Sequence, residues 1–102
     1  MSRDYERRGY PELCRRWRGK GGEIDLIFRN GEGLVFVEVK SSATLEKAAR
    51  SLSAHQIARL HRSAEEFLGT QPRGTLTEMR FDVALVNRRG EISIIENAIG
   101  DI

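Results

Sequence analysis

Two mainly apolar stretches of the chain, 23–29 and 34–40, each carry acidic residues and flank the turn sequence Asn30-Gly31-Glu32-Gly33. Short apolar runs bounded by turn residues are typical of strands, and the glycine-rich turn between them favours an antiparallel hairpin. A further apolar stretch at 79–86 and a short one around 92–95 flank a second turn sequence at 87–90. The pattern therefore predicts two strands in the first half of the chain and two near its end.

A segment with the spacing of an amphipathic helix lies between these two pairs of strands. Ser53 followed by Gln56 fits a capping box, and apolar residues then follow helical spacing up to the stop at Gly69. A helix end is expected at residues 1–9, with Gly9 as its stop, and a short strand around 13–17. The stretch 41–52 has no clear period and is compatible with a short helical turn.

The order of these elements predicts the fold class. A long helix between the strands at 34–40 and 79–86 allows a right-handed parallel crossover, whereas the 23–40 hairpin is antiparallel. We therefore expect an α/β fold with a mixed sheet of four to five strands flanked by helices. The 102 residues suit a single domain that spans the whole chain.

The hairpin carries acidic residues where a buried strand would be apolar. On alternation, Glu23, Asp25 and Ile27 share one face of the first strand, and Ile24, Leu26 and Phe28 share the other. A turn at 30–33 places Asp25 opposite Glu38 and Glu23 opposite Lys40. All four charged side chains then gather at the end of one sheet face, furthest from the turn.

Two carboxylates that face each other are destabilising, and a divalent cation such as Mg²⁺ would resolve the repulsion. Glu23 and Lys40 would form a cross-strand ion pair, or Glu23 would hold Lys40 in place for chemistry. The alternative is a solvent-exposed sheet end with one ion pair and two tolerated acids. The spacing alone leaves both interpretations open.

Composition is that of an ordinary soluble globular protein, with 39% hydrophobic and 31% charged residues. The longest apolar run, at 34–37, is far too short to span a bilayer, and no apolar leader opens the chain. Cys14 is the only cysteine, so it forms no intramolecular disulfide and is most simply a small buried hydrophobe. We expect no membrane contact and a cytoplasmic location.

Charge is concentrated near the N-terminus, where seven basic residues stand against three acidic ones among the first twenty. The four basic residues nearest the hairpin would form a patch that faces phosphates, with Trp17 as a stacking group; they are Arg15, Arg16, Arg18 and Lys20. The alternative is a solvated segment. Asp82 is expected to be structural, paired with Arg80 or with the sheet end.

Asp25, the Glu38-Val39-Lys40 triplet and a helix that carries Gln56 together resemble the PD-(D/E)xK, or restriction-endonuclease-like, superfamily of nucleases. More closely, the chain is similar to the YraN family of bacterial proteins, relatives of Holliday junction resolvases. The matching segments are Gly9-Tyr10, RRWRGKGGEIDLI at 15–27, LVFVEVK at 34–40, HQIARLHRSAEEFL at 55–68, RFDVALV at 80–86 and IENAI at 95–99.

This resemblance implies a Mg²⁺- or Mn²⁺-dependent endonuclease that acts on nucleic acid, most simply DNA and including branched DNA. Asp25, Glu38 and the Val39 carbonyl correspond to metal ligands, and Lys40 corresponds to the catalytic lysine. Glu23 would lie near the metal. Gln56 would lie near the site as well, or serve only as the cap partner of Ser53. Cutting two strands would call for two sites, which makes a homodimer an expected arrangement.

The chain departs from the family pattern in two places. Members of the family open with a longer helix whose acidic residue would fall before Met1 here, so the resemblance leads us to expect a shortened N-terminal helix in this sequence. After the lysine they continue with threonine and arginine, where this chain has 41–44 as Ser-Ser-Ala-Thr. Both departures favour the alternative function, a nucleic-acid-binding module on the same fold with weak or lost catalysis.

Overall fold

The computed structural model describes residues 2–41, 47 and 53–98 of the chain. Within them lie α1 (Ser2–Arg7), β1 (Glu12–Arg18), β2 (Glu23–Asn30), β3 (Gly33–Ser41), α3 (Ala54–Leu68), the 3₁₀ helix η1 (Gly74–Leu76), β4 (Met79–Val86) and β5 (Ile92–Ile95). The predicted helices and strands are confirmed, and the short strand expected at 13–17 is longer by one residue at each end. The helical turn expected within 41–52 falls, apart from residues 41 and 47, outside the described residues.

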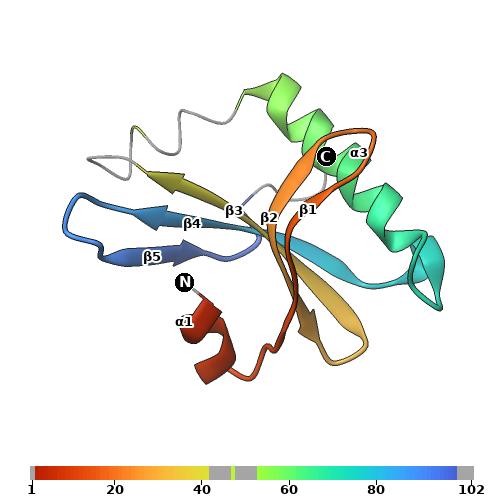
Figure 1. The fold of residues 1–102 in the computed structure, drawn as a ribbon, viewed down its shortest axis with the longest axis horizontal. Coiled ribbons are helices and arrows are strands. Elements are labelled where there is room, and N and C mark those ends of the chain that lie inside the picture. The colour runs from red at the N-terminus through yellow and green to blue at the C-terminus, as the bar shows by residue number, and fades with distance from the viewer. Residues whose placement is uncertain (1, 42–46, 48–52, 99–102) are drawn as a thin grey trace.

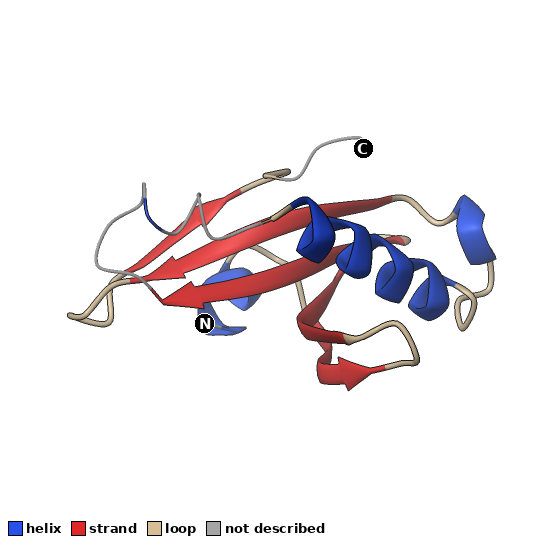
Figure 2. Ribbon diagram, turned by 90° about the horizontal axis from the view of Figure 1, so that it is seen from above, coloured by secondary structure: helices blue, strands red, loops and turns tan. Residues whose placement is uncertain are grey.

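The described strands form one mixed sheet in the order β1-β2-β3-β4-β5. β3 and β4 run parallel, as the crossover through α3 requires, and the other neighbours are antiparallel (Figure 1). Figure 2 shows α3 lying along the sheet. This is the predicted α/β class, and it is compatible with a restriction-endonuclease-like fold.

Alternation along β3 divides the core between the two faces of the sheet. Leu34 and Phe36 join the apolar residues of α3 in one buried cluster, whereas Val35 and Val37 pack with Tyr5 of α1 in another. α3 contributes to the first cluster the apolar stripe that its spacing predicted, namely Leu60, Ala64, Phe67 and Leu68. Each helix therefore covers its own face of β3.

The predicted register between β2 and β3 is confirmed from Asn30–Gly33 back to Leu26–Val37. There the pairing of β2 with β3 ends, while β2 continues to pair with β1 as far as Glu23. The start of β2 thus leaves β3 and turns with β1 toward α3 (Figure 1). As a result Ile24 packs in the α3 core together with Ile27, and the prediction that these two residues lie on opposite faces is wrong.

A local irregularity in β1 accompanies this turn. Arg16 has a φ of 52°, a left-handed conformation that few non-glycine residues adopt. Cys14 and Trp17 consequently both pack against the α3 core, although strict alternation would separate them. The Trp17 ring meets Phe67 edge to face, with 5.3 Å between the centroids. Trp17 therefore packs against the core while staying partly exposed, and a stacking role for it stays a prediction.

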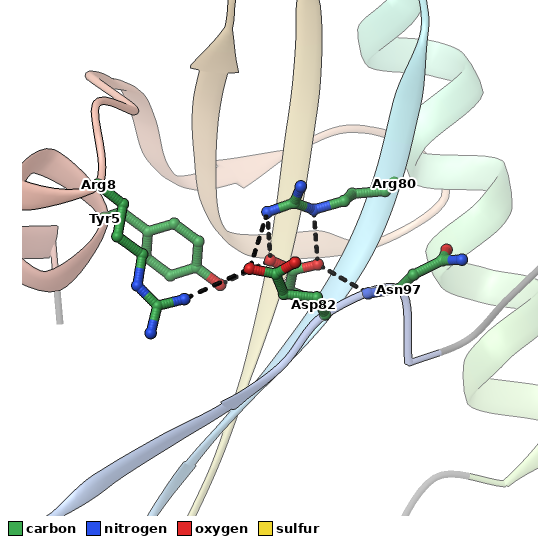
Figure 3. Close-up of polar contacts among 6 residues, drawn as sticks. Tyr5, Arg8, Arg80, Asp82 and Asn97 are labelled. Atoms are coloured by element: carbon green, nitrogen blue, oxygen red, sulfur yellow. Dashed lines mark hydrogen bonds and ion pairs between the residues drawn. The ribbon is translucent and has the colours of Figure 1, made fainter.

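Asp82 is fully buried and joins the two ends of the described chain (Figure 3). Its carboxylate accepts hydrogen bonds from Tyr5 Oη at 3.0 Å, from Arg80 Nε and Nη2 at 3.0 and 3.2 Å, and from the Asn97 N–H at 3.0 Å. The structural role predicted for Asp82, with Arg80 as its partner, is confirmed. The Arg80 guanidinium also lies over the Tyr10 ring, 5.2 Å from its centroid.

Replacing Tyr5 with Phe should lower the free energy of unfolding by about 1–3 kcal/mol, because a buried carboxylate loses a hydrogen bond while the ring stays. Tyr5 stacks on Phe28 at 4.3 Å between centroids, and phenylalanine preserves that contact. Urea denaturation of both proteins measures the difference. An unchanged free energy would mean that the hydroxyl contributes nothing to holding α1 on the sheet.

Candidate functional site

A cleft of about 500 Å³ opens where β2 leaves β3. Its walls come from the β1–β2 turn, the start of β2, β3 and α3. The lining residues are Arg18, Gly19, Lys20, Gly21, Gly22, Glu23, Asp25, Glu38 and Arg59. The cleft therefore combines the two acids singled out in the sequence with basic side chains from two other elements.

Asp25 lies at the point where the strands part. Its Oδ2 accepts a hydrogen bond from the Val39 N–H at 2.8 Å. Because the main-chain pairing ends at Leu26, this carboxylate supplies the partner that the Val39 amide would otherwise lack. Asp25 is thus held beside β3 by the same backbone segment that carries Glu38 and Val39.

Glu38 is mostly buried beside Asp25, as the predicted register requires. Burial, and after it the negative charge of Asp25, raises the pKa of Glu38 to about 7. The positive charges of Lys40 and Arg59 act in the opposite direction. The two carboxyl groups are close enough to share a hydrogen bond when Glu38 is protonated, and they become a like-charge pair as pH rises through 7.

This donor set suits a hard divalent cation. Mg²⁺ is commonly held by one or two carboxylates together with waters, and Asp25, Glu38 and the Val39 carbonyl are the donors that this point of the cleft offers. No group of three or more His, Cys, Asp or Glu side chains suited to a metal occurs in the part of the chain that the structure describes. Asp25, Glu38 and the Val39 carbonyl offer oxygen donors, whereas zinc sites usually include nitrogen or sulfur ligands.

Lys40 has the position expected from its strand, but not the expected partner. Its Nζ lies 3.9 Å from Glu38 Oε1, and its side chain is only 20% exposed. The predicted Glu23–Lys40 pair is wrong, because β2 has left β3 before Glu23 and follows β1 instead. Lys40 therefore places its charge beside the acid pair itself.

Glu23 lies on the wall of the cleft and bonds two arginines of β1. Arg18 Nη2 donates to one of its carboxylate oxygens at 3.1 Å, and Arg16 Nε donates to the other at 3.2 Å. These bonds, Arg18 first, hold the pKa of Glu23 below its usual range. Glu23 thus balances the charge of the β1 arginines, and a direct role near a metal stays a prediction.

The basic residues predicted from the sequence separate into two groups. Arg18 and Lys20 line the cleft, whereas Arg15 and Arg16 are not among its lining residues. Arg15 Nη2 bonds Glu12 Oε1 at 2.7 Å within β1. The structure therefore brings part of the predicted basic patch to the acid pair, and phosphate binding by all four residues stays a prediction.

Gln56 forms the capping box predicted for α3. Its N–H donates to Ser53 Oγ at 3.1 Å, and its Oε1 accepts from the Ser53 N–H at 3.3 Å. Its side chain is thereby engaged at the helix start, and it does not line the cleft. The cap role is confirmed, whereas a role of Gln56 at the site stays a prediction.

The residue of α3 that does reach the cleft is Arg59, which was not predicted from the sequence. Four polar residues of α3 lie next to the β1–β2 turn, namely Arg59, Arg62, Ser63 and Glu66. Their spacing places them on one side of a helix, next to the apolar stripe. This polar stripe was the available signal, and it is weak because solvated helix faces show the same pattern.

Glu66 fixes the turn between β1 and β2 on α3. Its carboxylate accepts the Lys20 N–H at 2.9 Å and the Gly21 N–H at 3.3 Å, and these bonds lower its pKa. A Cβ on Gly19 would collide with Glu66 and Trp17, so the close approach requires glycine there. The turn that carries Lys20 is therefore docked on the helix that carries Arg59.

Comparison with known proteins identifies relatives of the whole chain. The model of a family described as Uncharacterised protein family UPF0102 matches residues 2–86. A UPF0102 protein of Ruegeria pomeroyi is 60% identical over 96% of this chain and 80% of its own length. A UPF0102 protein of Cereibacter sphaeroides is 52% identical over 96% and 84%, and one of Roseobacter denitrificans is 48% identical over 97% and 77%. The family membership expected from the sequence motifs is thus confirmed, whereas the expected relation to PD-(D/E)xK nucleases and junction resolvases stays a prediction.

The raised pKa of Glu38 makes stability depend on pH with a definite sign. The folded-state pKa of about 7 exceeds the ordinary 4.5, so Glu38 binds its proton more tightly in the folded protein than in the unfolded one. Its contribution to the free energy of unfolding, compared with that of an uncharged side chain, is therefore smallest above pH 7. The free energy of unfolding of wild type, relative to Glu38→Gln, should therefore fall as pH rises from 4.5 to 7. Urea titrations across this range, and ¹³C NMR titration of the Glu38 carboxyl, measure it. A pH-independent difference would contradict the close acid pair.

Proposed function

The chain belongs to the uncharacterised protein family UPF0102, and we propose that it is a divalent-cation-dependent nuclease that hydrolyses phosphodiester bonds in DNA. One observation carries the proposal: two carboxylates are held together in a cleft beside a lysine, with basic side chains on the surrounding walls. Two carboxyl groups that are held close together, so that the pKa of one is raised, are typical of functional sites. The motif resemblance to PD-(D/E)xK nucleases and to junction resolvases supports the same proposal.

Asp25, Glu38 and the Val39 carbonyl would hold Mg²⁺ or Mn²⁺. When bound, such a cation polarises a phosphoryl oxygen and lowers the pKa of a coordinated water. The Val39 N–H fixes Asp25, so this ligand is oriented before the cation arrives. Burial of Glu38 favours its neutral form, and a cation would shift it to the carboxylate.

Lys40 would act on the reacting phosphate as a point charge. Its ammonium lies within 4 Å of a proposed cation ligand, at 3.9 Å from Glu38 Oε1, and most of its side chain is shielded from water. A preorganised charge in such a setting stabilises the negative charge that develops in the transition state more than the same charge would in water. Lys40 would also orient a water through its N–H donors.

Arg18 and Lys20 on the cleft wall would hold the nucleic-acid backbone. Contacts of this kind position a strand without reading its sequence. The half-buried Trp17 contacts Phe67 in the core and does not line the cleft, which favours recognition through phosphates over recognition through bases. The substrate would then be selected by shape, as expected for branched DNA, and a homodimer would supply a cleft for each strand.

A second candidate is a nucleic-acid-binding module with weak or lost catalysis. The engagement of Glu23 by Arg18 and Arg16 favours it, because a third acid is thereby drawn toward the β1 arginines. Such a module would bind DNA through the same basic wall. It would show no cation-dependent hydrolysis.

Replacing Asp25 with Asn should abolish most of the stabilisation by Mg²⁺. Thermal melting of wild type and variant, each in EDTA and in excess Mg²⁺, measures it: the cation should raise the wild-type midpoint and barely move that of the variant. Glu32→Gln is a matched control, because Glu32 lies exposed in the turn at the other end of the same hairpin. Equal responses of Asp25→Asn and wild type would remove the metal site.

Replacing Lys40 with Ala should leave cation binding nearly intact, because the ammonium is no ligand, while hydrolysis should fall by roughly 10²–10³-fold. The assay uses labelled duplex, single-stranded and branched DNA with Mg²⁺, Mn²⁺ or EDTA. Binding of DNA by wild type without any cation-dependent cleavage would favour the binding module. A Lys40→Ala variant that cleaves at the wild-type rate would exclude Lys40 from the chemistry.

A further inference from the structure

Arg59 projects from α3 into the cleft that holds the acid pair, yet it bonds neither acid. It lines the cleft together with Asp25 and Glu38, and its positive charge favours the ionised form of Glu38. Its Nε is buried and has no hydrogen-bond partner. Among the described residues, no hydrogen bond or ion pair of the Arg59 side chain is found.

An unpartnered guanidinium nitrogen in this place needs an explanation, since buried polar groups are nearly always hydrogen-bonded. The other arginine of the cleft, Arg18, is paired with Glu23 at 3.1 Å. Arg15 and Arg16 on the same strand also have carboxylate partners. Arg59 therefore differs from the nearby arginines in having donors available for a ligand.

Packing against the β1–β2 turn holds the stem of Arg59 in place. Gly22 has a φ of +146°, and a Cβ there would lie 3.0 Å from Arg59 Cδ and 3.1 Å from Arg59 Cγ. The aliphatic stem thus lies directly on the backbone of Gly22, where a Cβ would be crowded and the positive φ favours glycine. Since the same turn is docked on Glu66, the arginine is held before any ligand binds.

We propose that Arg59 binds the phosphate on which the Asp25–Glu38 centre acts. The planar guanidinium donates to phosphate oxygens in a fork that a lysine cannot reproduce. Anionic ligand chemistry follows from the charges at hand, because the neighbouring Lys20 and Arg18 add positive charge to the same wall. This inference rests on the proposed function. It adds a residue of α3 to the proposed substrate contacts and gives that residue the reacting phosphate, whereas Arg18 and Lys20 would hold the rest of the backbone.

The proposal predicts effects of opposite sign on the two ligands. The charge of Arg59 opposes a cation bound at Glu38, so Arg59→Ala should bind Mn²⁺ at least as tightly as wild type does. The same variant should bind DNA roughly ten- to a hundredfold more weakly, the size of effect expected for one charge-assisted contact to phosphate. A residue with a purely structural role would weaken both.

Calorimetric titration with Mn²⁺ and anisotropy of labelled duplex DNA in Ca²⁺ measure the two affinities, and gels verify that the DNA stays intact. The variants are Arg59→Ala, Arg59→Lys and Arg73→Ala. Arg73 is an exposed arginine that lines a different hollow, beside Arg29 and Thr77, so its replacement removes the same charge away from the cleft. Thermal melting of each variant verifies folding.

The proposal is supported if Arg59→Ala binds DNA more weakly and if the slope of log affinity against log salt concentration falls by about 0.9 in magnitude. Arg59→Lys should recover only part of the DNA affinity. Arg73→Ala should change neither the DNA affinity nor the slope. Equal DNA affinities of Arg59→Ala and Arg73→Ala would overturn the inference. So would a parallel loss of Mn²⁺ and DNA binding with a lowered melting point. If wild type shows no Asp25-dependent Mn²⁺ binding, the proposed nuclease function fails, and Arg59-dependent DNA binding in EDTA still tests the phosphate contact separately.

Discussion

The hydrogen bond from the Val39 N–H to Asp25 makes the cleft compatible with a stable sheet. Where β2 leaves β3, an amide of a central strand loses its main-chain partner, and an unsatisfied amide at a half-buried position is costly. The carboxylate of Asp25 takes the place of that partner at 2.8 Å. The residue that permits the strands to separate is thereby the residue that brings negative charge to Glu38, so the opening and the acid pair have one cause.

α3 turns this opening into a cleft with a second wall. Its apolar stripe packs on the sheet, while the polar stripe beside it meets the β1–β2 turn. Glu66 binds two amides of the turn, and the stem of Arg59 lies on Gly22. The glycine-rich sequence between β1 and β2 therefore serves close packing against a helix, and the basic side chains of the turn and helix reach the acids as a consequence.

The regular parts of this structure were predictable because they follow from local periods. Apolar runs bounded by turn residues located the strands, helical spacing gave the buried stripe of α3, and turn chemistry set the register that brings Asp25 to Glu38. The misses occur where the backbone departs from those periods. The left-handed conformation of Arg16 redirects Trp17, and it has no sequence signal because Arg16 is not a glycine. The early end of the β2–β3 pairing redirects Glu23 toward β1, and no turn residue in β2 marks it. Arg59 was missed because its role depends on tertiary packing against Gly22.

The charges of the cleft favour binding a cation and an anion together over binding either one alone. Without a cation, the ionised forms of Asp25 and Glu38 repel each other and a phosphate, and this repulsion helps to raise the pKa of Glu38 to about 7. Without an anion, Arg59 and Lys20 face a bound cation with like charge. A phosphate next to a divalent ion relieves both repulsions at once, because each ligand neutralises the charge that opposes the other. Two ligands linked in this way increase each other's affinity by the same factor, so the arrangement selects a phosphate that arrives with a metal ion over a free anion or a free cation.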